Sequence, residues 1–99
     1  MKGGWVYILE CSDGRYYTGC TSDLSRRLEE HENGGYCRYT AARLPLTLVF
    51  SQRFPSIDDA IRAEKQIKGW SRKKKEALIR EDYNALHELA RCLNQTHYR

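Results

Sequence analysis

Five residues of this chain have side chains that could together transfer protons and bind charged groups. Tyr7, Tyr17 and His31 can each donate and accept a proton, and the guanidinium of Arg27 can bind an oxyanion through two parallel hydrogen bonds. The carboxylate of Glu64 can hold a cation. The five lie far apart along the chain, so they can form one site only if the fold brings them together.

A β-hairpin is predicted to carry the two tyrosines, on strands at residues 5–11 and 15–20. A two-residue loop between these strands would place Tyr7 and Tyr17 on opposite faces of the sheet. A three-residue loop, with Gly14 as a left-handed bulge residue, instead pairs Leu9 with Tyr17 and Tyr7 with Gly19. The sequence Ser-Asp-Gly at residues 12–14 suits the second arrangement, which places both tyrosines on one face.

A helix is predicted from position 21 or 22 to about residue 33, where two glycines end it. The hydroxyl group at position 21 or 22 can cap it, and Asp23 then lies in the first turn, where an acid is favourable. At about 100° per residue, Leu24 and Leu28 mark the buried stripe of this helix. His31 falls within that stripe and Arg27 at its edge, so both are expected to point partly toward the sheet.

The next segment, residues 34–45, is predicted to be a loop that interleaves aromatic and basic side chains: Tyr36, Arg38, Tyr39 and Arg43. Such a mixture suits base stacking and phosphate contact. It is equally compatible with an ordinary polar connection.

A third strand at residues 46–54 and a second helix that ends at Gly69 are predicted to follow, with a capping-box-like start to the helix at residues 56–59. Glu64 falls in the middle of the inward stripe of this helix, which comprises Ile57, Ala60, Ile61, Ile67 and the stem of Lys68. Because an unpaired buried charge is costly, Glu64 is expected to have a partner, which could be a metal, a cation or a water-filled cleft.

A third helix, capped by Ser71, is predicted to begin with four cations, Arg72, Lys73, Lys74 and Lys75. Cations at the positive end of a helix dipole oppose folding slightly, although the arrangement would suit a phosphate docked there. A last helix from about residue 82, marked by Leu86, Leu89, Ala90 and Leu93, is expected to cover the core and to lead into a polar tail.

The bulk properties predict one small domain spanning residues 1–99, and the pattern of apolar residues predicts that its C-terminal helix and tail lie at 82–99. The predicted class is α+β, a three-stranded antiparallel sheet flanked by about four helices. A net charge of +4 and an isoelectric point of about 9.0 suggest an anionic partner.

The four cysteines contain no CxxC pair, and no histidine lies at zinc-finger spacing, so a metal framework is not expected. The sequence shows no signal peptide and no long apolar run, which predicts a cytoplasmic protein without a membrane span. Its thiols are expected to be reduced, although their even number also allows disulfides.

The five candidate site residues resemble the residues that form the motifs of the GIY-YIG nuclease superfamily. Val6-Tyr7 falls where the first half of the name motif lies, with Trp5 in place of its glycine, and Tyr17-Thr18-Gly19 matches the second half, with Thr in place of Ile. Arg27, His31 and Glu64 follow in family order. The resemblance covers about residues 5–80, has no clear match for a later family asparagine, and is strongest to small stand-alone bacterial members.

This resemblance implies a GIY-YIG-like fold and a metal-dependent endonuclease that hydrolyses nucleic-acid phosphodiester bonds, with DNA as the expected substrate and repair or recombination as the expected role. Glu64 would bind Mg²⁺ or another hard divalent cation such as Mn²⁺, and Arg27 would bind the scissile phosphate. Tyr7, Tyr17 and His31 compete for the role of general base, and the family pattern favours a tyrosine with His31 as relay. The expected nucleic-acid contacts are Arg38, Arg43, Lys68, Arg72, Lys73 and Lys74, with Gly19 as a backbone position of the motif.

Simpler interpretations remain for each residue. The tyrosines could be ordinary sheet aromatics, and His31 could be a local cap near the end of its helix. Arg27 could pair with Asp23, and Glu64 could pair only with Lys68. The basic run at 72–75 could be a solvated face. A non-catalytic nucleic-acid-binding module is therefore one alternative to the nuclease, and a nuclease subunit that needs a protein partner is another. The protein is expected to be a monomer.

Overall fold

A computed structural model describes residues 3–82, and the predicted last helix therefore lies outside the described residues. The element order is β1 (Gly4–Glu10), β2 (Tyr16–Thr21), α1 (Leu24–Glu32), α2 (Arg38–Ala41), β3 (Thr47–Phe54), α3 (Ile57–Lys68) and α4 (Arg72–Ile79). The chain divides between Lys68 and Gly69 into two compact units, and the first of these contains the whole sheet. The prediction of an α+β fold with three antiparallel strands is confirmed.

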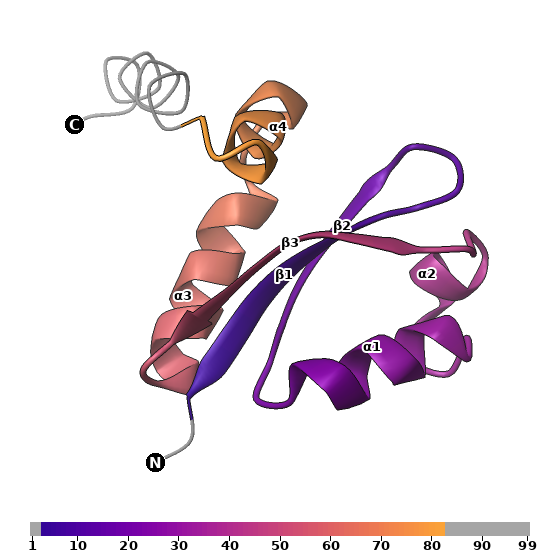
Figure 1. The fold of residues 1–99 in the computed structure, drawn as a ribbon, viewed down its shortest axis with the longest axis horizontal. Coiled ribbons are helices and arrows are strands. Elements are labelled where there is room, and N and C mark those ends of the chain that lie inside the picture. The colour runs from indigo at the N-terminus through magenta and orange to yellow at the C-terminus, as the bar shows by residue number, and fades with distance from the viewer. Residues whose placement is uncertain (1–2, 83–99) are drawn as a thin grey trace. The chain divides into compact units, whose positions relative to one another are not determined.

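The sheet has β1 in the middle, with β2 and β3 on its two sides and both pairings antiparallel (Figure 1). This central position explains why β1 is the most buried element: Val6, Tyr7 and Ile8 have no exposed surface and Leu9 is 2% exposed. Apolar side chains therefore point to both faces of this strand, as expected for a strand that is covered on both sides.

The two longer helices of the first unit cover opposite faces of the sheet. Gly4 lies against Ile57 and Ala60 of α3, so the even-numbered residues of β1 face that helix. The odd-numbered residues face the other way, where the Tyr7 side chain contacts His31 of α1. Figure 1 shows the strands passing between α1 and α3. The candidate residues must therefore be assigned to one face or the other.

The hairpin has the predicted three-residue turn. The amide of Gly14 donates to the Cys11 carbonyl at 2.9 Å, and the amide of Cys11 donates to the Arg15 carbonyl at 2.7 Å. Gly14 has a φ of 87°, the left-handed conformation that glycine adopts without strain. Tyr7 pairs with Gly19 and Leu9 pairs with Tyr17, so the two tyrosines share a face as predicted.

The N-terminus of α1 corrects one prediction. Asp23 is the N-cap and not a first-turn residue, because its carboxylate accepts from the Arg26 amide at 3.2 Å. The Thr21 hydroxyl supports the turn just before the helix and accepts from the Asp23 amide at 3.1 Å. Three consecutive residues can each cap a helix here, and the aspartate does so.

The segment predicted as a loop contains a one-turn helix, α2, and this is a second correction. The later boundaries follow the prediction. Ser56 accepts from the amide of Asp59 at 3.2 Å near the start of α3. Ser71 accepts from the amide of Lys74 at 3.2 Å and caps α4. The cysteines of the described part, Cys11, Cys20 and Cys37, are free thiols.

Candidate active site

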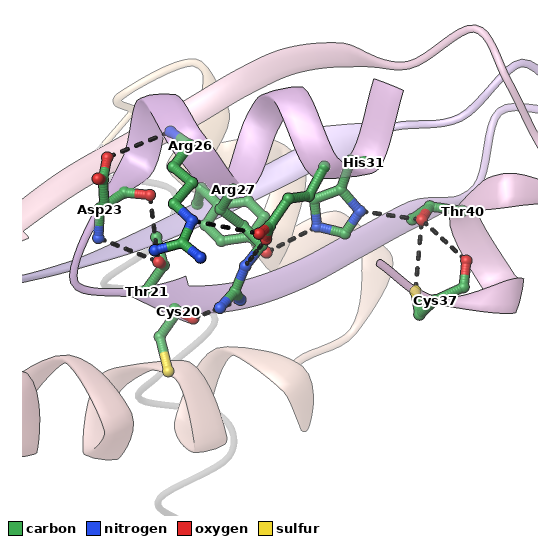
Figure 2. A network of polar contacts seen from close by, with 10 residues as sticks. Cys20, Thr21, Asp23, Arg26, Arg27, His31, Cys37 and Thr40 are labelled. Carbon is green, nitrogen blue, oxygen red and sulfur yellow. Dashed lines mark hydrogen bonds and ion pairs between the residues drawn. The ribbon is translucent and has the colours of Figure 1, made fainter. Parts of the chain in front are cut away.

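The centre of the candidate site is a chain of hydrogen bonds that runs from β1 through α1 to α2 (Figure 2). The Tyr7 hydroxyl lies 2.8 Å from Nε2 of His31, and Nδ1 of His31 lies 2.9 Å from the hydroxyl of Thr40. Tyr7, His31 and Thr40 are all fully buried. The Thr40 hydroxyl in turn donates to the carbonyl of Cys37 at 3.5 Å.

One assignment of the hydrogens satisfies every group in this chain. Tyr7 donates to Nε2 of a neutral His31, whose Nδ1–H donates to Thr40, which donates to the Cys37 carbonyl. Burial, followed by the positive charge of Arg27, lowers the pKa of His31, so the ring is neutral at physiological pH. The free lone pair of Nε2 is therefore directed at the tyrosine hydroxyl.

Arg27 lies near the same hydroxyl group. Its guanidinium donates to the carbonyl of Cys20 at 3.2 Å and pairs with Glu30 at 3.1 Å, rather than with Asp23. A hydrogen bond and the charge of Arg27 act to lower the pKa of Tyr7, but burial has the larger effect and raises that pKa to about 12. The tyrosine is thus neutral at rest and lies between a proton acceptor and a cation.

Tyr17 is in a less favourable position for proton transfer. Its ring centroid lies 6.4 Å from that of Tyr7 and 5.2 Å from that of His31, so it belongs to the same cluster. Burial raises its pKa, and the neighbouring Tyr7 and Cys37 raise it further. Tyr7, which has Arg27 and His31 beside it, is the better placed of the two tyrosines.

Two further tyrosines, Tyr36 and Tyr39, complete an aromatic cluster on this face. The Tyr36 ring lies 4.7 Å from the ring of His31, and the Tyr39 ring lies 6.0 Å from that of Tyr17. Each also has a guanidinium over its ring, Arg27 at 4.0 Å from the Tyr36 centroid and Arg43 at 4.1 Å from the Tyr39 centroid. The sequence prediction noted the aromatic and basic mixture here but did not include these tyrosines or Thr40 in the site.

Glu64 lies on the other face of the sheet, on α3. Its carboxylate pairs with Lys68 at 2.7 Å, and its side chain is only 13% exposed. It approaches the first group of residues at the edge strand β2. Burial, and then the charge of Glu64, raise the pKa of the Cys20 thiol, while Arg27 and Lys68 act in the opposite direction. Glu64 and Arg27 thus reach Cys20 from the two faces of this strand.

The six predicted nucleic-acid contacts differ in their surroundings. Arg38, Lys68, Arg72 and Lys73 are exposed, whereas Arg43 is half-buried beneath Tyr39 and pairs with Asp13 at 3.0 Å. Lys74 is 6% exposed, and its ammonium lies 4.2 Å from the centroid of the Trp70 ring. Burial lowers the pKa of Lys74. Lys74 is therefore not part of an exposed basic face.

The side chains around Glu64 determine what kind of metal ion could bind there. Among residues 3–82, no group of three or more His, Cys, Asp or Glu side chains could hold a metal. Glu64 alone offers a hard carboxylate, which suits a cation that keeps most of its water and binds substrate oxygens. The residues fit such a weakly held ion, with Glu64 as its protein ligand, and do not fit a fully enclosed metal site.

The fold and the site together define a class of protein, a small α+β domain in which a tyrosine-bearing hairpin packs against a helix that supplies an arginine and a histidine. Residues 3–77 match the family model described as the GIY-YIG catalytic domain. The chain belongs to the GIY-YIG family, which places it in a nuclease superfamily whose members generally use divalent metal ions and bind nucleic acid.

Relatives of similar size support this assignment. The chain is 48% identical over 75 residues to the UPF0213 protein BH0048 of Halalkalibacterium halodurans. The aligned residues make up 76% of this chain and 80% of that protein. It is also 51% identical over 74 residues to the UPF0213 protein VNG_2274C of Halobacterium salinarum, and the match covers 75% of this chain and 96% of that protein.

Two solution NMR structures resemble the fold. The structure of BH0048 aligns with a TM-score of 0.52 at 47% identity, over 78% of this chain and 82% of that one. Protein EF2693 from E. faecalis aligns with a TM-score of 0.58 at 33% identity, over 84% and 88%. Within the described part of the chain, no helix is long and apolar enough to cross a membrane.

Proposed function

We propose that this protein is a metal-dependent endonuclease that hydrolyses phosphodiester bonds in DNA. The observation that carries the proposal is the position of the Tyr7 hydroxyl, which lies 2.8 Å from Nε2 of a neutral His31 and close enough to Arg27 for that cation to act on its pKa. Hydrolysis needs a group that takes a proton from water, and it needs positive charge close to the phosphoryl oxygens. This arrangement offers both within one cluster.

Tyr7 and His31 act together as the base. As water attacks phosphorus, its proton passes to the Tyr7 oxygen and the Tyr7 proton passes to Nε2 of His31. A tyrosine with a pKa near 12 is a poor source of tyrosinate by itself, so the histidine is needed to accept the proton. Thr40 fixes the tautomer of His31 that leaves Nε2 free to accept it.

Arg27 binds the scissile phosphate. Its guanidinium can form two parallel hydrogen bonds to phosphate oxygens, which a lysine cannot reproduce. In the structure it is held by Glu30, the Cys20 carbonyl and the Tyr36 ring. Tyr7 is fully buried, and Arg27 and Tyr36 are among the groups close enough to affect its pKa.

Glu64 holds the divalent ion, Mg²⁺ or Mn²⁺, together with water. When bound, such an ion neutralises charge on the phosphoryl oxygens and supports the departing oxygen. Lys68 holds the Glu64 carboxylate until the ion binds and can then contact a substrate phosphate. The family relationship supports the need for a divalent metal, and the hard oxygen ligand supports these two ions.

The test is cleavage of a panel of labelled DNA and RNA structures with and without Mg²⁺. We expect Mg²⁺-dependent cleavage of DNA that falls by at least about a hundredfold in Tyr7→Phe, Arg27→Ala and Glu64→Ala. Matched controls are Arg62→Ala and Glu29→Ala, which remove exposed side chains of α3 and α1. Full cleavage by Glu64→Ala would refute the metal assignment, and binding without cleavage under any condition would favour a non-catalytic module.

A further inference from the structure

We propose that Tyr36 and Tyr39 form a stacking platform for unpaired bases, and that the strand bound at this site is therefore single-stranded DNA. The inference names the substrate of the site described above and rests on the proposed function for the choice of DNA. It is carried by the exposure of the two rings, the groups that hold them and their distance from the site.

Both tyrosines are exposed, although a guanidinium group lies over each ring. Tyr36 is 40% exposed and Tyr39 is 37% exposed. One side of each is covered by a guanidinium, Arg27 over Tyr36 at 4.0 Å and Arg43 over Tyr39 at 4.1 Å. The exposed part of each side chain is available to a base, because every base has a face that can stack on an aromatic ring.

The arginines are themselves fixed, so the platform is largely preorganised. Arg43 pairs with Asp13 at 3.0 Å and donates to the Tyr39 carbonyl at 2.9 Å. The Ser12 amide donates to the Arg43 carbonyl at 3.0 Å, which joins the hairpin turn to this segment. Arg27 is held by Glu30 and by the Cys20 carbonyl. Side chains that are already ordered lose little conformational freedom when a ligand binds.

The platform adjoins the proposed catalytic group. The Tyr36 ring lies 4.7 Å from the His31 ring, and the Tyr39 ring lies 6.0 Å from the Tyr17 ring. A base stacked on either tyrosine would therefore bring its own phosphate toward Arg27 and Tyr7. Arg38, on the same short helix as Tyr39, is exposed and forms no ion pair among residues 3–82, so its charge is available to the DNA backbone.

The requirement for unpaired DNA follows from the geometry of a duplex. The faces of paired bases are covered by their neighbours in the stack, and only their edges are accessible in the grooves. Rings that offer faces can bind a base only where the strand is single or the base is splayed out. A regular duplex would contact this surface through its phosphates alone.

The experiment measures binding in the absence of metal, so that it does not depend on cleavage. The anisotropy of a fluorescein-labelled single-stranded DNA is followed with the full chain in EDTA, and duplex DNA and single-stranded RNA of the same sequence are compared. We expect the single-stranded DNA to bind most tightly. Tyr36→Leu and Tyr39→Leu should each weaken this binding by at least about fivefold, whereas the corresponding Phe variants keep it.

Tyr16→Leu is the matched control, because Tyr16 lies on β2 with its side chain on the α3 face of the sheet. Its variant should bind like the wild type. Quenching of 2-aminopurine in the strand, lost in the Leu variants, would support stacking directly. Unchanged affinity in both Leu variants would overturn the proposal, as would duplex DNA or single-stranded RNA binding as tightly as single-stranded DNA.

The outcome separates the platform from the nuclease. If the wild type cleaves duplex DNA and the Leu variants bind DNA as well as the wild type does, the stacking platform is refuted and the proposed nuclease function stands. If single-stranded DNA binds in a way that depends on the two tyrosines but is never cleaved, the stacking platform stands and the proposed nuclease activity is refuted.

Discussion

The hydroxyl oxygen of Tyr7 lies so close to Gly19 on the neighbouring strand that a Cβ built on the glycine would come within 2.5 Å of it. The two residues are cross-strand partners, and the tyrosine side chain passes over the glycine to reach His31. The glycine of the motif is therefore needed for space, since the Tyr7 hydroxyl occupies the volume that any side chain would fill.

Gly19→Ala is accordingly expected to destabilise the protein by about 1–3 kcal/mol, the usual cost of overfilling a packed site, and to displace the Tyr7 hydroxyl from His31. Thermal unfolding and the NMR signals of the His31 ring would report the two effects. Gly35→Ala is the control, because its Cβ would meet nothing closer than 3.9 Å. Equal melting temperatures for the wild type and Gly19→Ala would contradict the steric argument.

The buried histidine predicts a pH dependence of stability. Burial and the charge of Arg27 lower the pKa of His31 below its usual 6.5, so the unfolded chain binds this proton at a higher pH than the folded chain does. The free energy of unfolding should therefore decrease as the pH falls through about 6.5, and be restored above it.

The check is the melting temperature at about pH 7.5 and about pH 5.5, for the wild type and for His31→Gln. The wild type should lose more stability than the variant over this interval, because only the wild type has the buried imidazole. Parallel losses in the two proteins would show that His31 is not the group responsible.

Thr18 offers a stabilising substitution. Its side chain stands where the family motif has Ile, the residue is 3% exposed, and its hydroxyl oxygen has no hydrogen-bond partner in the described structure. Thr18→Val has nearly the same shape and removes this hydroxyl, so it should raise the free energy of unfolding by about 1–3 kcal/mol. Urea denaturation would show a higher midpoint at an unchanged slope.

Thr47→Val, an exposed change on β3, is the control for β-propensity alone. The prediction fails if Thr18→Val unfolds at a lower urea concentration than the wild type does.

The pair formed by Glu64 and Lys68 predicts how the metal is bound. The ammonium of Lys68 pairs with the Glu64 carboxylate at 2.7 Å, so a metal cation must displace the ammonium to bind there. Lys68→Met should therefore tighten Mn²⁺ binding by between about 1.5- and fivefold, the range typical of an exposed ion pair. Paramagnetic broadening of the α3 amide signals measures this without substrate. Lys65→Met, which removes an exposed lysine of the same helix, should leave the affinity unchanged.

The parts of the fold that could be predicted from sequence are those set by nearby residues. Ser12, Asp13 and Gly14 specify a bulged turn, and the turn fixes the register that places Tyr7 and Tyr17 on one face. The serine caps of α3 and α4 were predicted for the same reason. Each of these features depends on a few adjacent side chains and their own backbone.

The parts that could not be predicted depend on contacts between distant segments. A four-residue helix such as α2 is too short to show a periodic pattern, so the role of Thr40 beside His31 had no signal in the sequence. The inward stripe of α3 suggested that Glu64 was buried, but not which face of the sheet the helix covers. The docking of α3 decides that Glu64 and Tyr7 approach from opposite sides.

The central position of β1 has a consequence for how the protein is made. This strand pairs with β2 and β3, which flank it in the sheet, and it packs against α3, the last helix of its unit. The burial of Val6 and Ile8, which face α3, is therefore complete only after the ribosome has released the chain through Lys68. A nascent or truncated chain that ends before α3 carries the tyrosines, the arginine and the histidine, but it lacks the packing that holds them in register.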